Sequence, residues 1–353
     1  MGDIDKENGS GSGNQAALEA FRFSVAPMMD YTDRHFRVLM RQISRRCLLY
    51  TEMVVAQALH HSNRAAAAEP ASQRLERLIG FDPLEKPLAL QLGGEDPVLL
   101  AEAAGLAEAW GYDELNLNVG CPSAKVQQGR FGACLMAEPE RVAEAVAAMA
   151  AACKLPVTVK HRIGVDERDS YGELLAFVDS VAAAGARRFC VHARKAWLEG
   201  LDPKQNRTIP PLRYDLVHRL KLERPQLTIE LNGGLETPGD CQRELARVDG
   251  VMVGRAAYDH PLRWAGVDRE IFGEPDSTDL RPSQVLRGLL PYSERWCGAG
   301  GRLWPIARHL VHLVEGISGA RHWRRQLAEA AGQAGAGAEV LTEAARSLEE
   351  RGF

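Results

Sequence analysis

The sequence contains no run of eighteen consecutive apolar residues and no apolar segment of the signal-peptide kind. The simplest interpretation is a cytoplasmic protein with no membrane partner. It also contains no CxxC pair, and its seven cysteines are an odd number scattered through apparent core segments. We therefore expect reduced thiols, with neither a disulfide framework nor a bound metal.

An excess of positive charge is also missing, since 43 Lys and Arg face 47 Asp and Glu. A basic surface is the usual footprint of a phosphate-binding protein, so the overall charge gives no sign of nucleic acid. The balance changes locally between Arg302 and Arg325, where five arginines face a single acid, Glu315. By composition alone, this stretch is an ordinary solvated helix face.

Short apolar runs recur from residue 21 onward, and each is separated from the next by enough sequence for a helix. The eight runs are residues 23–26, 48–53, 87–92, 114–118, 156–161, 188–192, 227–231 and 250–253. Ala-rich stretches between them, such as 97–110, 138–153 and 171–184, have helical periodicity. These alternating units over residues 21–275 predict an α/β fold, a (β/α)8 TIM barrel, whose typical size is ~250 residues. A doubly wound open sheet is the alternative, although its Gly fingerprint is absent from the first strand turn.

The two ends of the chain have a different character. Residues 1–20 are rich in Gly, Ser, Asn and charge, and we expect a disordered N-terminal tail. Residues 276–353 lack strand patterns and predict a small all-helical domain, with helices at 282–296, 305–317, 320–331 and 339–350. Arg321, Arg324 and Arg325 share one face of the third helix, and such a concentration of charge suits phosphate contacts.

Polar residues and glycines gather at the ends of the predicted strands, where TIM barrels build active sites. In chain order they are Pro27, Met28, Met29 and Asp30; Glu52; Gln91, Gly93 and Gly94; Asn118 and Cys121; Lys160 and Arg162; His192 and Arg194; Asn232, Gly233 and Gly234; and Gly254 and Arg255. The glycines of the last two strands let backbone N–H groups approach an anion closely. Gly233 and Gly234 alone would be a simple turn, but beside Gly254 and Arg255 they favour a bound cofactor phosphate.

Cys121 stands at one of these strand ends, in the segment with the most specific pattern. The preceding residues 115–119 alternate apolar and amide side chains like a strand, and Gly120 and Pro122 make a stiff turn around the thiol. A small buried cysteine is the commoner fate of a free thiol, but the leucines and valine of 115–119 already supply the apolar face. A nucleophilic thiol needs a lowered pKa and usually a nearby His, whereas a proton donor must stay protonated. The residues alone do not distinguish the two tasks.

The predicted loop at residues 193–211 is too long for a simple connection. Four basic residues and a tryptophan lie on it: Arg194, Lys195, Lys204, Arg207 and Trp197. Basic and aromatic side chains together suit the binding of a sugar–phosphate chain beside the barrel mouth. A solvated loop with ordinary surface charge is the alternative.

Two motifs carry a resemblance to a known family. NLNVGCPS at 116–123 and QGRFGACLM at 128–136 closely resemble the tRNA-dihydrouridine synthases, in particular those of the A type. The similarity runs from about residue 23 to residue 325, and one small departure is Tyr31, where Trp is expected. It implies FMN-dependent, NADPH-driven reduction of the C5–C6 bond of uridines 20 and 20a in the D-loop of tRNA. In that chemistry reduced flavin gives hydride to C6 and Cys121 gives a proton to C5.

The resemblance also assigns residues to the cofactor and to the tRNA. The positions that match FMN contacts are Pro27, Met28, Met29, Gln91, Lys160, His192, Asn232, Gly233, Gly234, Gly254 and Arg255. The candidate tRNA contacts are Asn118, Lys204, Arg207, Arg321 and Arg324 by resemblance, with Arg162 and Arg194 added from the barrel mouth. A Lys beside the flavin would stabilise its anionic reduced ring by roughly 4 kcal/mol at ~4 Å and an effective dielectric near 20. No obligate protein partner is evident, and a monomer is expected.

Two other functions remain open. A TIM-barrel flavoprotein reductase of a small pyrimidine or enone would turn over without tRNA and would use the helical domain for dimerisation. A non-catalytic tRNA-binding protein would bind tRNA without flavin, but the intact Cys121 and the complete set of strand-end residues argue against it.

Overall fold

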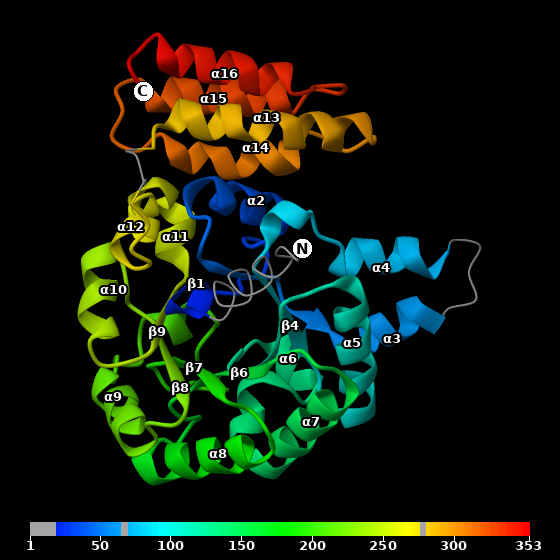
Figure 1. Cartoon of the computed structure of the whole chain (residues 1–353), viewed down its shortest axis with the longest axis vertical. Helices are drawn as coiled ribbons and strands as arrows, with labels where there is room; N and C mark the ends of the chain where they lie inside the picture. Colours follow the sequence, from blue (N-terminus) through cyan, green and yellow to red (C-terminus); the bar gives the residue numbers. More distant parts are fainter. Residues whose placement is uncertain (1–18, 65–69, 276–279) are drawn as a thin grey trace, which may run out of the picture.

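The computed structural model describes residues 19–64, 70–275 and 280–353. Figure 1 shows a barrel of strands wrapped by helices, with a bundle of helices stacked on one side of it. Most of the tail predicted at residues 1–20 lies outside the described residues. The last residue of that range, Ala20, is buried and begins the short 3-10 helix η1 (Ala20–Arg22).

Parallel strands form a closed ring in the described part of the chain. Its eight members are β1 (Phe23–Val25), β2 (Leu48–Tyr50), β4 (Leu88–Gly93), β5 (Glu114–Val119), β6 (Val157–Arg162), β7 (Arg188–His192), β8 (Thr228–Asn232) and β9 (Gly250–Val253). They pair in the order β1-β9-β8-β7-β6-β5-β4-β2, and the pairing of β2 with β1 closes the ring. The predicted (β/α)8 TIM barrel is confirmed, and the open sheet is excluded.

The second predicted strand, at residues 48–53, ends early as β2, and a separate short strand that was not predicted, β3 (Val54–Val55), follows it. β3 pairs with the carboxyl end of β4, beyond the point where β2 stops. Between the two strands, Glu52 leaves the ladder and its carboxylate accepts the backbone N–H of Asp30 (2.5 Å). The interruption therefore joins the ends of the first two barrel strands at the mouth.

Helices cover the outside of the ring. They are α2 (Arg34–Ile43), α3 (Ala56–Arg64), α4 (Ala71–Ile79), α5 (Pro97–Trp110), α7 (Pro139–Ala152), α8 (Tyr171–Ala183), α9 (Tyr214–Glu223) and α10 (Pro238–Leu245), with the shorter α6 (Ala124–Gln128), α11 (Arg255–Asp259) and α12 (Val267–Glu270). The bounds predicted for α5 are confirmed, because local signals set both ends. Asp96 accepts two backbone N–H groups of the first turn, Pro97 takes the first position, and Gly111 ends the helix in a left-handed conformation.

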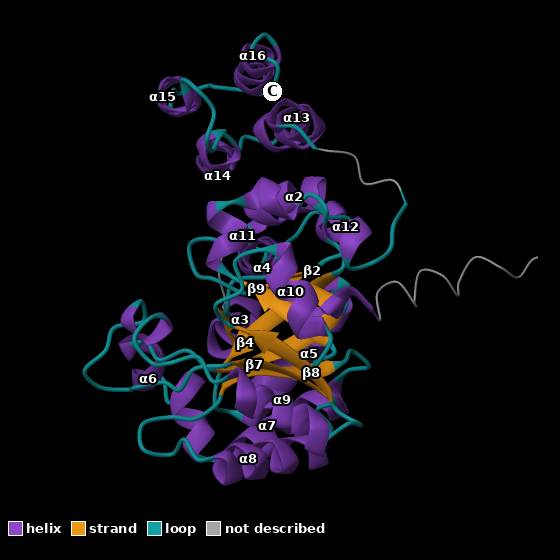
Figure 2. Cartoon of the chain, turned by 90° about the vertical axis from the view of Figure 1, so that its left-hand side faces the viewer, coloured by secondary structure: helices purple, strands orange, loops and turns teal. Residues whose placement is uncertain are grey.

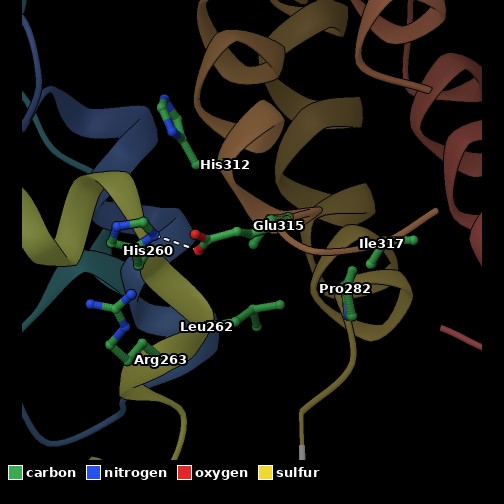
Figure 3. Close-up of a pocket in the computed structure, with 8 residues that line it drawn as sticks. His260, Leu262, Arg263, Pro282, His312, Glu315 and Ile317 are labelled. Carbon is green, nitrogen blue, oxygen red and sulfur yellow. Dashed lines mark hydrogen bonds and ion pairs between the residues drawn. The ribbon is translucent and has the colours of Figure 1, made fainter. Parts of the chain in front are cut away.

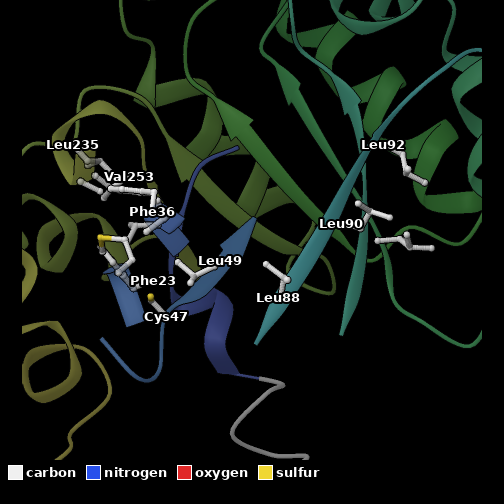
Figure 4. Packing of buried hydrophobic residues seen from close by; sticks show 14 of the residues in the cluster. Phe23, Phe36, Cys47, Leu49, Leu88, Leu90, Leu92, Leu235 and Val253 are labelled. Atoms are coloured by element: carbon white, nitrogen blue, oxygen red, sulfur yellow. The ribbon is translucent and has the colours of Figure 1, made fainter. Parts of the chain in front are cut away.

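Two hydrophobic layers hold the barrel together. The larger layer lies between strands and helices, and Figure 4 shows Leu88, Leu90 and Leu92 of β4 within it. Each such fully buried leucine contributes roughly 1.5–3 kcal/mol to folding. A smaller cluster lies inside the ring: Ala26, Leu48, Tyr50, Ala89, Cys190 and Met252. Because side chains alternate along a strand, the amides of β5 face this interior while its leucines face the helices.

The described region from residue 280 onward is helical, as predicted. It contains α13 (Pro282–Gly298), α14 (Trp304–Leu310), α15 (Ala320–Ala331) and α16 (Glu339–Glu349), which bury Leu289, Trp323, Leu327 and Leu341 between them. The helix predicted at 305–317 was too long. α14 ends at Leu310 and continues as the 3-10 turn η6 (Val311–Leu313), and the chain then bends through Gly316, whose φ of 69° is incompatible with a helix.

No helix in the three described ranges combines the length and the apolar character that crossing a bilayer requires. All seven cysteines carry free thiols.

Asp33 joins the barrel to the helical bundle. As the N-cap of α2, it accepts the backbone N–H groups of His35 (3.0 Å) and Phe36 (2.9 Å). It also accepts Nε2 of His309 (2.9 Å) and Nη2 of Arg308 (2.6 Å) from α14. Burial on its own would raise the pKa of Asp33, but the hydrogen bonds and positive charge from His309 and Arg308 hold it well below its ordinary value.

Replacing Asp33 with Asn should weaken this junction in a pH-dependent way. Asn keeps an acceptor for the cap but removes the charge opposite Arg308, so we expect the free energy of unfolding to fall by about 2 kcal/mol at neutral pH. The folded pKa is depressed, so the contribution of the carboxylate is fully present above the unfolded pKa of ~3.9 and declines as the pH falls below it. Urea unfolding at neutral pH and near pH 3 measures both values. An equal difference between variant and wild type at the two pH values would contradict the assignment.

Candidate active site

Cys121 lies on a tightly held turn at the carboxyl end of β5. Oδ1 of Asn118 accepts the backbone N–H groups of Gly120 (3.1 Å) and Cys121 (3.0 Å). The carbonyl of Cys121 accepts the N–H of Ala133 (2.9 Å), and the neighbouring Gly132 has φ 78° with no room for a Cβ. The thiol is partly exposed and lies 3.6 Å from Oγ of Ser123. The backbone therefore holds this thiol at the barrel mouth.

Positive side chains surround the turn. Burial lowers the pKa of Lys160 to about 8 and that of Arg162 to about 10. Nζ of Lys160 donates to Oδ1 of Asn232 (3.0 Å), and Lys160 forms no ion pair with any described residue. A buried cation at the strand ends that forms no ion pair with a described residue suits an anionic ligand.

His192 lies among the same cations. Burial, followed by the charges of Arg162, Lys160 and Arg194, lowers the pKa of His192 well below its ordinary value, so its imidazole is neutral at pH 7. Its ring lies against Gly233, where a Cβ would come within 2.7 Å of Cδ2. The next residue, Gly234, would bring a Cβ within 2.5 Å of Leu212. Both glycines have positive φ, 109° and 73°, a backbone conformation that other residues rarely adopt, so glycine is required at both positions.

Gly233→Ala should therefore lower both the stability of the protein and the affinity of the site for its cofactor. We expect a loss of about 1–3 kcal/mol in the free energy of unfolding, because a non-glycine residue at φ 109° is strained and its Cβ meets His192. Affinity for FMN, the cofactor that the resemblance predicts, should fall as well. Gly172→Ala is the matched control, since Gly172 lies within α8 with nothing within 4 Å of its Cβ position, and there we expect no loss of stability. Thermal unfolding and FMN titration of both variants test this, and equal behaviour would contradict it.

Arg162 is buried beneath the cysteine turn and holds the backbone around it by hydrogen bonds. It is only 3% exposed, and its guanidinium donates to the carbonyls of Gly120 (2.9 Å), Lys195 (3.0 Å) and Asn206 (3.0 Å). It thus ties the cysteine turn to the loop at 193–211. His161 packs outward against Phe177 and Phe189, so Lys160 and Arg162, its two neighbours along β6, point to the opposite side of the strand.

The remaining predicted tRNA contacts are exposed or half-exposed. Arg194 donates to the carbonyl of Pro210, and Lys204 and Arg207 lie on the outer part of the same loop. Arg321 and Arg324 project from α15 without an ion pair among the described residues. Figure 2 shows α6, which follows β5, and α15 on the same side of the molecule. The loop region after β5 and the helix that carries Arg321 and Arg324 therefore lie on one side of the molecule.

Comparison with known proteins assigns the chain to a family. The family model described as "Dihydrouridine synthase (Dus)" matches residues 24–349. The chain belongs to the dihydrouridine synthase family. It is 55% identical over 320 residues to the tRNA-dihydrouridine(20/20a) synthase of Synechocystis sp., covering 90% of this chain and 92% of the relative.

Further relatives carry the same name. The tRNA-dihydrouridine(20/20a) synthase of Salmonella typhi is 50% identical over 337 residues, with 95% of this chain and 98% of the relative covered. That of Escherichia coli K12 is 50% identical over 331 residues, with 94% and 92% covered. Among solved structures, morphinone reductase is similar over 72% of this chain and 87% of its own, with a TM-score of 0.46 and 13% identity. The predicted membership of this oxidoreductase family is confirmed.

In this dihydrouridine synthase, the first strand end also reaches the mouth. Pro27 precedes Met28, whose N–H donates to Oγ1 of Thr32 (2.9 Å), and Met29 is 52% exposed. Gly254 lies at the start of α11, within 3.6 Å of the sulfur of Met28 measured from its Cβ position. Arg255 is exposed, and after burial its positive charge also lowers the pKa of Arg194 and that of Arg207. Gly254, one of the predicted phosphate glycines, is thus a neighbour of the first strand end.

Three supporting residues were missed in the sequence analysis. Asn116 and Thr158 are buried inside the barrel, where their side chains hydrogen-bond to each other (2.9 Å). The alternation of amides in the 116–123 motif could have indicated Asn116 as an inward residue. Asn206 is fully buried and organises the 193–211 loop through Trp197, by a hydrogen bond from the N–H of Trp197 (2.8 Å) and one to its carbonyl (2.9 Å). No local signal marks Asn206, because its partners depend on the path of the loop.

A cavity of about 400 Å³ lies apart from these residues, between the barrel and the helical bundle (Figure 3). It is lined by residues that follow β9, including His260 and Arg263, and by Pro282, His312 and Glu315 from the bundle side. Nδ1 of His260 pairs with the carboxylate of Glu315 across it. None of the predicted cofactor or tRNA residues lines this cavity.

Proposed function

We propose that this protein reduces the C5–C6 bond of uridines 20 and 20a in the D-loop of tRNA to dihydrouridine, with bound FMN and with NADPH as the reductant. The observation that carries the proposal is the rigid Cys121 turn among cations at the carboxyl end of a TIM barrel. The names of the relatives, tRNA-dihydrouridine(20/20a) synthases, support the same substrate.

The residues at the strand ends fit FMN. Gly233, Gly234 and Gly254 carry no side chain that would keep a phosphate from their backbone N–H groups, and Arg255 supplies a positive charge next to Gly254. Lys160 has a buried ammonium with no ion pair among the described residues, which suits the anionic edge of a reduced flavin. The contacts of Pro27, Met28, Met29, Gln91, His192 and Asn232 with FMN belong to the same proposal. When bound, FMN would supply the hydride that adds to C6 of the uracil ring.

Cys121 supplies the proton in this proposal. Its thiol gives a proton to C5 of the uracil ring, and the turn fixes the direction from which the proton comes. Asn118 lies two strand positions behind the turn and orients the base through its amide. The base must leave its helical stack to reach this thiol, so the tRNA presents a flipped uridine to the mouth.

The tRNA would contact two regions that face the same side. Beside the mouth, Arg194, Lys204 and Arg207 lie on the 193–211 loop, while Arg162 holds that loop from below. On α15, Arg321 and Arg324 would bind phosphates farther along the tRNA. We therefore divide the chain into an FMN-binding barrel at 21–275 and a tRNA-binding helical domain at 276–353. The protein would act as a monomer in the cytoplasm, where tRNA is found.

Turnover of the purified protein with NADPH and unmodified tRNA tests the proposal. The visible spectrum is recorded first, and dihydrouridine is mapped by mass spectrometry afterwards. Flavin absorbance together with dihydrouridine at positions 20 and 20a is the expected result. Flavin without a tRNA product would favour a reductase of a small pyrimidine or enone. Binding of tRNA with no flavin, even after FMN is added, would favour a non-catalytic tRNA-binding protein.

A further inference from the structure

Beneath the cysteine turn, the barrel interior contains one continuous row of hydrogen-bonded side chains, here termed the amide relay. Nδ2 of Asn118 donates to Oε1 of Gln91 (2.9 Å), and Nε2 of Gln91 donates to Oδ1 of Asn116 (2.8 Å). Nδ2 of Asn116 then donates to Oγ1 of Thr158 (2.9 Å), which donates to Oε1 of Glu114 (2.7 Å). The row crosses from β5 to β4, back to β5 and on to β6. Its last four members are at most 5% exposed.

Asn118, at the end of the amide relay next to Cys121, fixes the donor-to-acceptor direction of its hydrogen bonds. Oδ1 of Asn118 accepts two backbone N–H groups, those of Gly120 and Cys121, and a backbone N–H can only donate. Asn118 must therefore turn its Nδ2 toward Gln91. A flipped amide would place a donor against two donors.

Thr158 and Glu114, at the other end of the amide relay, fix the same donor-to-acceptor direction independently. Glu114 is 5% exposed and its carboxylate pairs with Arg188, so it is an acceptor only. The other partner of the Thr158 hydroxyl is the carbonyl of Leu115 (3.0 Å), which also can only accept. The single hydroxyl hydrogen of Thr158 is thus donated to these acceptors, and its oxygen must accept the N–H of Asn116. Both ends agree, so every amide between them has one allowed orientation.

We propose that Glu114, Thr158 and Asn116 are positioning residues that hold Asn118 in this orientation and, through it, the Cys121 turn. Oδ1 of Asn118 is already occupied by two N–H groups, so Asn118 can offer a ligand only its remaining N–H. Such a donor suits a carbonyl oxygen of a pyrimidine ring, as in uracil, and opposes the amino group that cytosine carries. This part of the inference rests on the proposed function.

Thr158→Val tests the relay, with Thr158→Ser as the matched control. Val keeps the shape and the branching of Thr but can neither accept from Asn116 nor donate to Glu114, whereas Ser keeps the hydroxyl. We expect Thr158→Val to lower kcat for tRNA roughly 100-fold, the scale of a misplaced reacting group, with KM for tRNA little changed. Thr158→Ser should restore most of kcat. Loss of kcat in both variants to the same extent would overturn the assignment.

Alkylation of Cys121 provides a second measurement that needs neither cofactor nor tRNA. Iodoacetamide is added to the full chain, and the modified Cys121 peptide is quantified by mass spectrometry. A loosened Asn118 no longer holds the N–H of residue 121, so the thiol should react several-fold faster in Thr158→Val than in wild type or Thr158→Ser. Equal rates in all three proteins would overturn the proposal.

Asn116→Leu replaces Thr158→Val if the latter does not fold, because it removes both central bonds of the relay with a side chain of similar size. The same two readouts apply to it, with the same expected and contradicting results. A wild-type protein that forms no dihydrouridine would refute the proposed function. The alkylation rates would still decide whether the relay holds the cysteine turn.

Discussion

Cys121→Ala is expected to lower kcat for dihydrouridine formation by about 100- to 10,000-fold, the range over which a positioned proton donor acts. The change removes the thiol but leaves the turn, because Asn118 accepts the backbone N–H of residue 121 whatever side chain it carries. Affinities for FMN and tRNA should therefore be retained. Single-turnover reduction of tRNA by the NADPH-reduced protein, with separate titrations of FMN and tRNA, measures each quantity.

Cys153→Ala is the matched control for this experiment. Its thiol is partly buried at the end of α7, where Sγ donates to the carbonyl of Met149 (3.5 Å), and it takes no part in the barrel mouth. We expect this variant to keep wild-type turnover. Undiminished turnover of Cys121→Ala would refute the role of Cys121 as the acid. Loss of FMN along with turnover would make Cys121 a structural residue instead.

Arg324→Glu should weaken tRNA binding by about tenfold or more and leave NADPH oxidation unchanged. Arg324 is exposed on α15, far along the chain from the barrel strands, and has no ion pair among the described residues. The change removes one phosphate contact and adds a repulsive charge, so the dependence of log Kd on log salt should also lose about one unit of slope. A salt series of tRNA binding and a steady-state assay of NADPH oxidation measure the two effects.

Arg346→Glu makes the same change of net charge on α16. Arg346 already pairs with Glu343 (2.6 Å) and Glu350 (3.0 Å), and its side chain is exposed. We expect its tRNA affinity to stay near that of wild type. Equal weakening by the two substitutions would mean that overall charge, and not contact with α15, governs binding.

Local patterns were enough for most of the architecture. The helix at 97–110 could be read to the residue, since Asp96, Pro97 and Gly111 mark its ends within the sequence. The strands at 188–192 and 250–253 were equally clear, because short apolar runs between helices have few alternatives. Where a boundary depended on distant contacts, the sequence was a poorer guide, and the predicted strand at 48–53 was too long because Glu52 turns away to meet Asp30.

Some residues of the candidate site were also indicated by local sequence patterns, whereas the role of others depends on distant contacts. Cys121, Gly233 and Gly234 could be found because a thiol between Gly and Pro, or a Gly pair after a strand, has a local physical meaning. Arg162 was predicted as a tRNA contact, and its hydrogen bonds to three backbone carbonyls, which lie 33 to 44 residues away in sequence, could not be foreseen. Asn206 was not found at all, because its burial follows from the path of the whole loop.

The sequence alone therefore sufficed for the barrel, for the family and for the residues at the strand ends, since each rests on a periodicity or on a motif of neighbouring residues. The closure of the ring through β2 and β4, the junction at Asp33 and the direction of the amide relay became known only from the folded chain. These features depend on which donor meets which acceptor across separate strands. Such pairings are set by three-dimensional packing, and no spacing along the chain encodes them.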